Sequence, residues 1–578
     1  MSKIVELRPD RNLIRNNFEG YKLSLDPVPL LRQELSSLPF RAETNEDQYT
    51  FLRYSLLHAE LFSMQNLLHV DPWSRTICYY ISRLGEIIRT VYNESTGRGE
   101  SMQIVYRLNT AATRVKGDYN YSMRFISEKY CVICDGIQSI YLLDTKDRLK
   151  ATEWILIAET NLNNEALGER NFMLFDCRLD IVQEKKQISM AIGRVKRIDN
   201  ITAGGSSHFM HLHWGKWIQN ENWDFSVIDT LEGKGSLYYC AFEPRAESLI
   251  ICSNHEYSFR SKKTNGSCEI NVENAELHDE NYEIGGYTWS QTDEDIIIKF
   301  DVKEGKERSD YKIKYVANKL TVKVGEEVLL DNELYDKIDQ ELTTWTIENN
   351  YLQITLVKQN QSSSWLSLFR NNAGPKETLD DSRQSDLPID QKPIVNLETP
   401  IEDCDFPMGT IDDEIKIGRY HMPSKSVTHA VLFGSTPPIF STILRPGFPN
   451  ALAIRQDVDA GLWLQQYNPS KPEDWSLRHE GNLHAFGYVQ ASKQQRKFVD
   501  CSPDLNYAII CESHRHVFLY KSNYDGADGL RNRNGPQVKI GKQHLITLED
   551  AGEVLGLATA EHVVTILTER CIIHLQLS

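Results

Sequence analysis

The feature that most constrains this chain is an internal repeat whose two copies lie far apart, at residues 242–259 and 501–518. Each copy is typical of a turn, a mostly apolar strand, a short polar turn and another strand, which is half of a propeller blade. A degenerate third copy follows at Val132-Ile133-Cys134 with Tyr141. The identically spaced residues are Pro244, Ile250, Ile251, Cys252, His255 and Phe259 in the first copy, and Pro503, Ile509, Ile510, Cys511, His514 and Phe518 in the second.

Other segments of both flanks have the composition of paired strands. They are residues 77–89, 153–159 with 172–177, 451–465 and 554–576. Neither flank repeats often enough to close a ring alone, but together they suffice for seven or eight blades of roughly forty to fifty residues. The sequence therefore predicts an all-β fold, a β-propeller of seven or eight blades interrupted by an inserted domain. Two independent domains are the alternative topology.

A closed ring should also bring the two ends of the chain together, because closure leaves few exposed sheet edges. Residues 18–25 and 571–577 are both short strand candidates. We expect these two segments to pair in one sheet.

Residues 287–369 have the two-residue period of half-buried strands. Ile296, Ile298 and Phe300 fall on one face of an extended segment, while Ile297 and Lys299 fall on the other. This pattern predicts an antiparallel β-sandwich of about eighty residues. The alternation recurs at Tyr311, Ile313 and Tyr315, at Leu320, Val322 and Val324, at Trp345 and Ile347, and at Leu352, Ile354 and Leu356.

At these residues the chain resembles the CS domain of the NudC family. The resemblance rests on YTWSQT at residues 287–292, LLDNELY at 329–335 and TTWTI at 343–347. Asn332 stands where the family usually has glycine, and we expect the turn to survive because Asn tolerates a positive φ angle. Residues 18–25, 457–459 and 487–493 extend the resemblance over essentially the whole chain, to family members in which the CS domain interrupts a propeller.

The resemblance implies a non-enzymatic co-chaperone or client-binding adaptor of cytoplasm and nucleus. Such a protein would recognise other proteins through its CS domain and its propeller. The resemblance suggests a DEAH-box RNA helicase as client and the ninety-kilodalton heat-shock chaperone as a further partner. A constitutive scaffold subunit of a stable protein complex is the alternative.

Charge favours protein partners over nucleic acid, because a net charge of −17 repels phosphate backbones. Six acids and no Lys or Arg lie in residues 269–283, and twelve acids against three bases lie in residues 376–414. These runs are either solvated linkers or an acidic rim that contacts a basic partner. The expected domains are residues 1–271 and 415–578 for the propeller, 282–370 for the CS domain and 371–414 for an acidic linker.

Other patterns argue against a cofactor, a metal or a membrane span. The sequence lacks an apolar run of bilayer length, and its eleven cysteines form no dense framework, which fits a reducing compartment. Cys131 and Cys134 have metal-ligand spacing but sit in an apolar strand, and His208, His211 and His213 lack a fourth ligand nearby in sequence. No phosphate cradle or nucleophile elbow is recognisable. We therefore expect neither catalytic nor cofactor-binding residues.

Aromatic residues of the CS segment are the candidates for contact with a client protein. They are Tyr287, Trp289, Trp345 and Trp365. A tryptophan in so small a sandwich is either part of its core or an exposed anchor for a partner. The sequence leaves both possibilities open for each indole.

Overall fold

Strands dominate the computed structural model, in which the described residues form nine β-sheets. Seven sheets lie in a unit made of residues 1–197, 208–268 and 406–578, and two lie in a unit that contains residues 269–405. The structure describes residues 2–577 without 15–17, 44–54, 64, 110–112, 151–152, 163–169, 201–204, 262–286, 292–294, 302–307, 326, 349–350, 360–364, 366–367, 370–413 and 523–538.

The seven sheets of the first unit follow one another along the chain as propeller blades. Blade 1 contains β4 (His69–Val70), β5 (Ile77–Ile81), β6 (Glu86–Asn93) and β7 (Arg98–Gly99), with β8 (Gln103–Arg107) also paired to β6. Blade 2 contains β9 (Ser122–Phe125), β10 (Tyr130–Cys134), β11 (Ser139–Asp144) and β12 (Ile155–Asn161). Blade 3 contains β13 (Met173–Val182), β14 (Lys185–Asn200), β15 (Gly205–Gln219), β16 (Trp223–Gly233) and the short β19 (Ser258–Phe259).

The remaining blades include the strands from the C-terminal flank. Blade 4 contains β17 (Leu237–Phe242), β18 (Ser248–Ser253), β27 (Lys416–His421) and β28 (Ser426–Leu432). Blade 5 contains β29 (Phe440–Thr442), β30 (Ala451–Gln456), β31 (Asp459–Gln466) and β32 (Ser476–Leu483). Blade 6 contains β33 (Arg496–Cys501), β34 (Tyr507–Glu512), β35 (His516–Lys521) and β36 (Lys539–Thr547), and blade 7 contains β37 (Val554–Thr559), β38 (Val563–Thr568) and β39 (Cys571–Gln576).

Every pair of neighbouring blades shares a buried apolar cluster. The cluster between blade 7 and blade 1 contains Leu555 and Ile572 from the C-terminal flank, and Leu68 and Tyr80 from the N-terminal flank. It therefore closes the ring. The prediction of a β-propeller with an inserted CS-type sandwich is confirmed, and the blades number seven among the described residues.

The internal repeat corresponds to the second strand of a blade. Ile250 in β18 packs toward blade 5, whereas its neighbour Ile251 packs toward blade 3. Ile509 and Ile510 in β34 divide in the same way between blades 7 and 5. Because both faces of the strand are buried, the sequence is a continuous apolar run instead of an alternating one. Val132 and Ile133 in β10 likewise face the two neighbouring blades. The degenerate third copy is therefore also the second strand of its blade.

Two details of the strand pattern differ from the prediction. Phe259 does not occupy the place of Phe518, because β19 pairs with β16 in blade 3 while Phe518 lies in the third strand of blade 6. Residues 153–159 and 172–177 do not form a pair either. The first segment belongs to β12, the outer strand of blade 2. The second leads into β13, the first strand of blade 3.

The inserted domain interrupts blade 4 between its second and third strands. β18 and β27 pair directly, with Ser253 opposite Lys416, so the two ends of the insertion leave the sheet side by side. A buried ion pair joins the two flanks at this point, since the Arg419 guanidinium lies 2.9 Å from the carboxylate of Glu243. The fourth blade is therefore one sheet assembled from both sides of the insertion.

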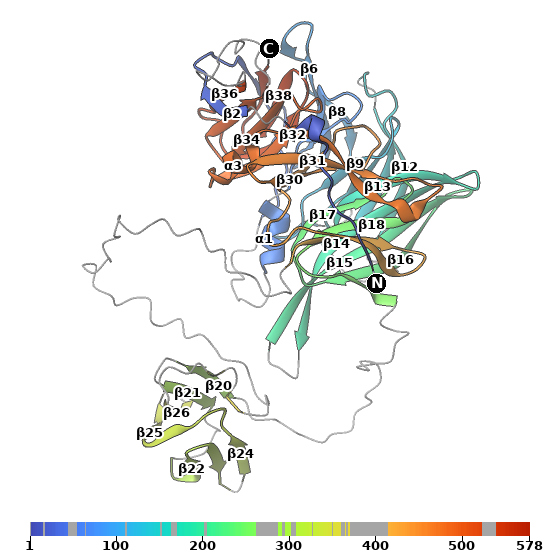
Figure 1. The fold of residues 1–578 in the computed structure, drawn as a ribbon. Helices are drawn as coiled ribbons and strands as arrows, with labels where there is room; N and C mark the ends of the chain where they lie inside the picture. The colour runs from blue at the N-terminus through green and yellow to red at the C-terminus, as the bar shows by residue number, and fades with distance from the viewer. Residues whose placement is uncertain are drawn as a thin grey trace. The chain divides into compact units, whose positions relative to one another are not determined.

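The N-terminal residues supply outer strands to three blades of the C-terminal flank. β1 (Lys3–Ile4) pairs with β28, β2 (Phe18–Leu23) pairs with β36, and β3 (Leu30–Glu34) pairs with β39. Figure 1 shows blue β2 beside orange β36. The N-terminal and C-terminal parts of the chain do meet in one sheet, but it is residues 30–34 that pair with the C-terminal strand β39. The expected pairing of residues 18–25 with 571–577 is wrong, because β2 adds to the neighbouring blade.

Two sheets make up the CS sandwich. The first contains β20 (Tyr287–Gln291), β21 (Asp295–Asp301), β26 (Tyr351–Lys358) and β25 (Ile338–Glu348) in that order, and the second contains β22 (Tyr311–Val316), β23 (Lys319–Val324) and β24 (Glu327–Glu333). Asn332 lies within β24 opposite Leu320, so the expected turn at this residue is wrong. The helices in the described part of the chain are α1 (Leu56–Ser63), α3 (Phe486–Ala491) and the 3-10 turns η1 (Arg11–Leu13), η3 (Arg308–Asp310) and η6 (Pro472–Asp474). No helix among the described residues has the length and apolar content that crossing a bilayer requires.

Candidate functional site

The CS sandwich has a single core between its two sheets. Its strands alternate as expected, with Ile296, Ile298 and Phe300 of β21 buried and facing Leu320 and Val322 of the second sheet. All buried residues of this core lie between Trp289 and Phe369. The sandwich therefore needs no residue from the propeller to complete its interior.

Two of the four candidate anchors belong to this core. Trp289 and Trp365 are each only 2% exposed. The Trp365 ring packs against Tyr335 at 6.0 Å between ring centroids, and Leu334 pairs with Phe369 beyond the end of β24. Trp365 and Phe369 thus pack near the end of β24. Neither indole presents a surface to a partner in this structure, and for Tyr287 the backbone of β20 is described but its side chain lies outside the described residues.

Trp345 is the half-buried candidate. It lies on the inner face of β25, opposite Ile354, but β25 is the edge strand of its sheet, so one side of the indole is not covered by a neighbouring strand. The Arg308 guanidinium stands over the ring, 5.1 Å from its centroid, in a cation–π contact. The exposed part of Trp345 is therefore held beside a positive charge.

Four apolar side chains lie partly buried at the edges of the two sheets on this side. We call this group the edge seam, and it consists of Ile313 and Tyr315 from β22 with Trp345 and Ile347 from β25, all partly buried against the core. The hydroxyl of Tyr315 donates a hydrogen bond of 3.0 Å to the carbonyl of Thr343 and fixes the two edges to each other. Sequence reasoning placed these residues in strands but missed Ile313, Tyr315 and Arg308 as site residues, because strand order is not readable from alternation.

Lysines dominate the outer face of β22 and β23. Lys312, Lys314 and Lys323 are exposed, and Lys312 lies directly opposite Lys323. Like charges in directly opposed positions destabilise a sheet, so this arrangement has an energetic cost. Lys319 is neutralised by Asp331, whose carboxylate is 3.0 Å away. The candidate site is thus an apolar seam bordered by positive charge, within a protein of strongly negative net charge.

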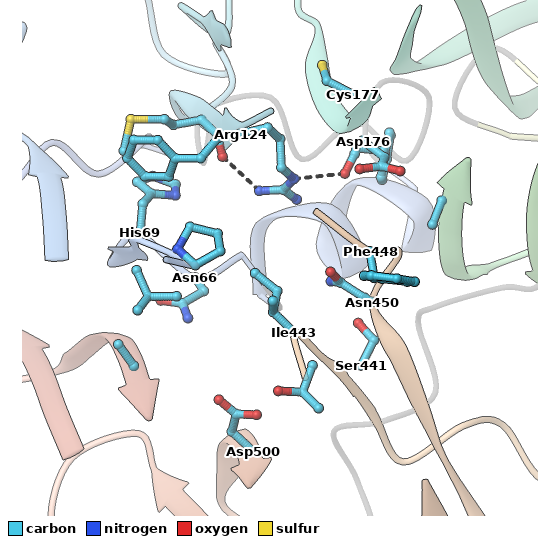
Figure 2. Close-up of a pocket in the computed structure, with 18 of the residues that line it drawn as sticks. Asn66, His69, Arg124, Asp176, Cys177, Ser441, Ile443, Phe448, Asn450 and Asp500 are labelled. Atoms are coloured by element: carbon cyan, nitrogen blue, oxygen red, sulfur yellow. Dashed lines mark hydrogen bonds between the residues drawn. The ribbon is translucent and has the colours of Figure 1, made fainter. Parts of the chain in front are cut away.

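The propeller contains a central channel of about 240 Å³. The first strands of all seven blades line it, namely β4, β9, β13, β17, β29, β33 and β37. Figure 2 shows Arg124 and Asp176 on one side of this channel and Asp500 across from them. Arg124 donates to the carbonyl of Phe175 at 2.9 Å, and Arg75 donates to the carbonyls of Thr559 and Ile443 at 2.7 and 2.6 Å. These guanidinium groups connect different blades across the ring.

Burial controls the titration of the channel residues. It raises the pKa of Asp500 above its ordinary value, partly opposed by the positive charge of Arg75. Burial lowers the pKa of His69 to about 3 and raises the pKa of the Cys177 and Cys240 thiols. His69 is therefore neutral and both thiols are protonated near pH 7. Thiols in this state are weak nucleophiles.

The two metal candidates from the sequence are not assembled into a site. Cys131 and Cys134 are three residues apart in β10 and point to opposite faces, into the cores shared with blade 1 and blade 3 respectively. His213 shares a hydrogen bond of 2.9 Å with Thr230, and His211 lies 3.4 Å from the carboxylate of Glu232. Among the described residues no group of three or more His, Cys, Asp or Glu side chains is gathered as metal ligands.

Both acidic runs, residues 269–283 and 376–414, lie almost wholly outside the described residues. Their role as linkers or as an acidic rim stays a prediction, as do the domain boundaries drawn through them.

Comparison with known proteins agrees with this arrangement. A model of the CS domain matches residues 285–358. NudC domain-containing protein 1 from Mus musculus is 29% identical over 98% of this chain and 97% of its own length, and the protein of the same name from Xenopus laevis is 27% identical over the same shares. A solved structure, the nuclear movement protein from E. cuniculi GB-M1, is 31% identical, with 14% of this chain and 96% of that chain covered and a TM-score of 0.13.

Fold and comparison together define a class: propeller proteins that carry a CS domain, a module for protein–protein interaction, inside one blade. The similarity to the curated relatives extends over both flanks of the insertion as well as the CS domain. The chain is therefore similar, in its propeller as well as in its CS domain, to the proteins named NudC domain-containing protein 1.

Proposed function

We propose that this protein is a non-enzymatic co-chaperone or client-binding adaptor that recognises other proteins through its CS domain together with its propeller. The observation that carries the proposal is the edge seam. It leaves Tyr315, Trp345 and two isoleucines only partly buried, whereas Trp365 is 2% exposed. Partly exposed aromatic residues in an apolar groove are the usual anchors of protein interfaces.

The propeller supports the proposal as a rigid second surface. Its ring is closed by apolar clusters between all neighbouring blades, and arginines connect the blades across the channel. A rigid body loses little conformational freedom when it binds, so its surfaces suit the binding of a partner. The two channel thiols, Cys177 and Cys240, have a raised pKa and are not activated as nucleophiles.

The partners that we propose rest on the similarity to the curated relatives. They are the ninety-kilodalton heat-shock chaperone and a client of the DEAH-box RNA helicase class, met in the cytoplasm and the nucleus. What supports them is the similarity over the whole chain to NudC domain-containing protein 1 and the presence of the CS domain. A net charge of −17 supports protein partners over direct nucleic-acid binding.

The test is a comparison of partners captured from cells by the full chain and by a variant in which a short flexible linker replaces residues 272–400. We expect the deleted form to lose its clients, and the full chain to release a client once that client is folded. Retention of all partners at unchanged yield and fixed stoichiometry would favour the constitutive scaffold instead. Purified protein should show no ATP hydrolysis; turnover at enzyme-like rates contradicts both functions.

A further inference from the structure

The outer side of β22 is a strand edge that no described strand covers. β22 ends the order β22-β23-β24, and the other edge of the same sheet, β24, is continued by the pairing of Leu334 with Phe369. Unpaired backbone N–H and C=O groups on a free edge are a template for the addition of another strand. Along both edge strands of this sheet, β22 and β24, no described strand pairs on the outer side, so the side chains decide which edge suits a partner.

The side chains of β22 divide cleanly between two environments. Ile313 and Tyr315 point inward to the edge seam, next to Trp345, while Lys312 and Lys314 point outward and are exposed. A strand added beside β22 would follow the same alternation, because successive side chains point to opposite faces. Its inward residues would meet the apolar side chains of the edge seam, and its outward residues would meet lysines.

Charge decides which kind of strand fits this edge. A second copy of this chain, added edge to edge, would bring its own Lys312 and Lys314 beside those of the first copy. Like charges on neighbouring strands repel, and lysine on an edge is a common protection against self-association. A strand with acidic outward residues instead neutralises these lysines and offsets the unfavourable pairing of Lys312 with Lys323.

We propose that the free edge of β22 binds an extended segment of a partner protein that alternates apolar and acidic residues, by addition of a strand to the three-stranded sheet. The proposal rests on the proposed function and names the chemistry of the partner. The apolar side chains occupy the edge seam between Tyr315 and Trp345, and the carboxylates face Lys312 and Lys314. β22 has six residues, so a segment of about that length is sufficient.

The experiment uses the full chain and a fluorescent six-residue peptide of alternating valine and glutamate, with binding measured by fluorescence anisotropy. We expect saturable binding that weakens as salt is raised, and none for a matched peptide of alternating valine and lysine. The double variant Lys312→Glu with Lys314→Glu should weaken binding about tenfold or more, because two attractive charges become repulsive. Lys299→Glu, on the outer face of the other sheet, is the matched control and should change binding little.

Peptide methylation separates strand addition from simple charge attraction. An added strand makes its main-chain hydrogen bonds through alternate residues. One peptide is methylated at the amide nitrogens of its valines, and a second peptide at those of its glutamates. Only one of these two peptides should therefore bind. Equal binding of both peptides, or an equal loss from Lys299→Glu and from the β22 double variant, would overturn the proposal.

Two further outcomes show whether another segment occupies the edge, or which of the two proposals fails. Binding that appears only after the acids between residues 376 and 414 are replaced by their amides assigns the edge to the chain's own acidic run and overturns the assignment to a partner. A β22 double variant that keeps every client, when removal of residues 272–400 loses them, overturns this inference and leaves the proposed function intact. If the removal loses no client, the proposed function fails, whatever the peptide does.

Discussion

The propeller and the CS sandwich are both made of short antiparallel strands, yet they bury those strands in opposite ways. A propeller sheet shares each face with a different neighbour, so adjacent residues such as Ile250 and Ile251 belong to different cores. The CS sheets enclose one core, and their strands alternate buried and exposed residues. Each blade therefore contributes to the cores that it shares with two neighbouring blades, whereas the described core of the sandwich consists of its own residues alone.

This difference also determines where a free edge can exist. The N-terminal strands β1, β2 and β3 cover outer edges of three blades, although these strands come from the far end of the sequence. In the sandwich Trp365 is buried, whereas Trp345 on the edge strand β25 is only partly buried. The comparison agrees with the proposed function, in which the ring is the stable body and the sandwich binds partners.

The strongest test of this comparison removes one strand of the ring. Deletion of residues 571–578 takes away β39, whose Ile573 and Leu575 belong to the core with blade 6 and whose Ile572 belongs to the core with blade 1. It also leaves β3 without its partner. We expect loss of the cooperative thermal transition and aggregation, measured by calorimetry and light scattering. A soluble monomer with an unchanged melting temperature would contradict ring closure.

A matched pair of substitutions tests the two ends of the sandwich. Trp365→Ala should destabilise the CS domain by about 3–5 kcal/mol, because it empties a buried site. Trp345→Ala should cost roughly 1–2 kcal/mol, since its ring is already partly hydrated. Denaturant unfolding, followed in the full chain by hydrogen exchange of peptides from residues 287–358, separates this domain from the ring. Equal losses for the two variants would show that the two ends are equally closed.

The next test concerns the assembly of blade 4 from two flanks. Arg419→Met leaves the Glu243 carboxylate buried without its charged partner, and we expect a loss of about 3 kcal/mol in ring stability. Arg8→Met removes an exposed ion pair with Glu6 and should cost less than about 1 kcal/mol. Chemical denaturation with a fluorescence readout measures both. If the two substitutions have the same effect, the buried pair does not hold the flanks together.

The smallest expected effect is on the ring after removal of the sandwich. The ring cores contain no described residue between Phe259 and Ile415, and Ser253 lies opposite Lys416, so a short flexible linker in place of residues 272–400 should be tolerated. We expect a cooperative melt within about 2 °C of the value for the ring transition in the full chain, because apolar burial in the ring is unchanged. Loss of the transition would reject the inserted topology.

Much of the architecture is present in local sequence. The run Ile250-Ile251-Cys252 and its counterpart in β34 indicate a strand buried on both faces, and alternation at residues 296–300 indicates one buried on a single face. These patterns depend only on which faces are covered. They are sufficient to predict the class of fold and the place of the insertion.

What could not be predicted depends on contacts between distant segments. Residues 18–25 have strand composition, but their pairing with β36 and not with β39 is decided by the path of the backbone around the ring. Trp345 and Trp365 are the same residue type, and only the order of the strands makes one an edge residue and the other a core residue. The site residues Arg308 and Tyr315 carry no local signal of their own.

The place of the insertion also sets an order of events during synthesis. β18 leaves the ribosome before the CS domain, whereas its partner β27 follows only after every residue between Ser253 and Lys416 has been made. At about 5–20 residues per second, β18 waits roughly ten to thirty seconds with one edge unpaired. Within that time the CS domain can fold, because its core is local in sequence. The nascent chain therefore presents a finished binding domain while its own ring is still open.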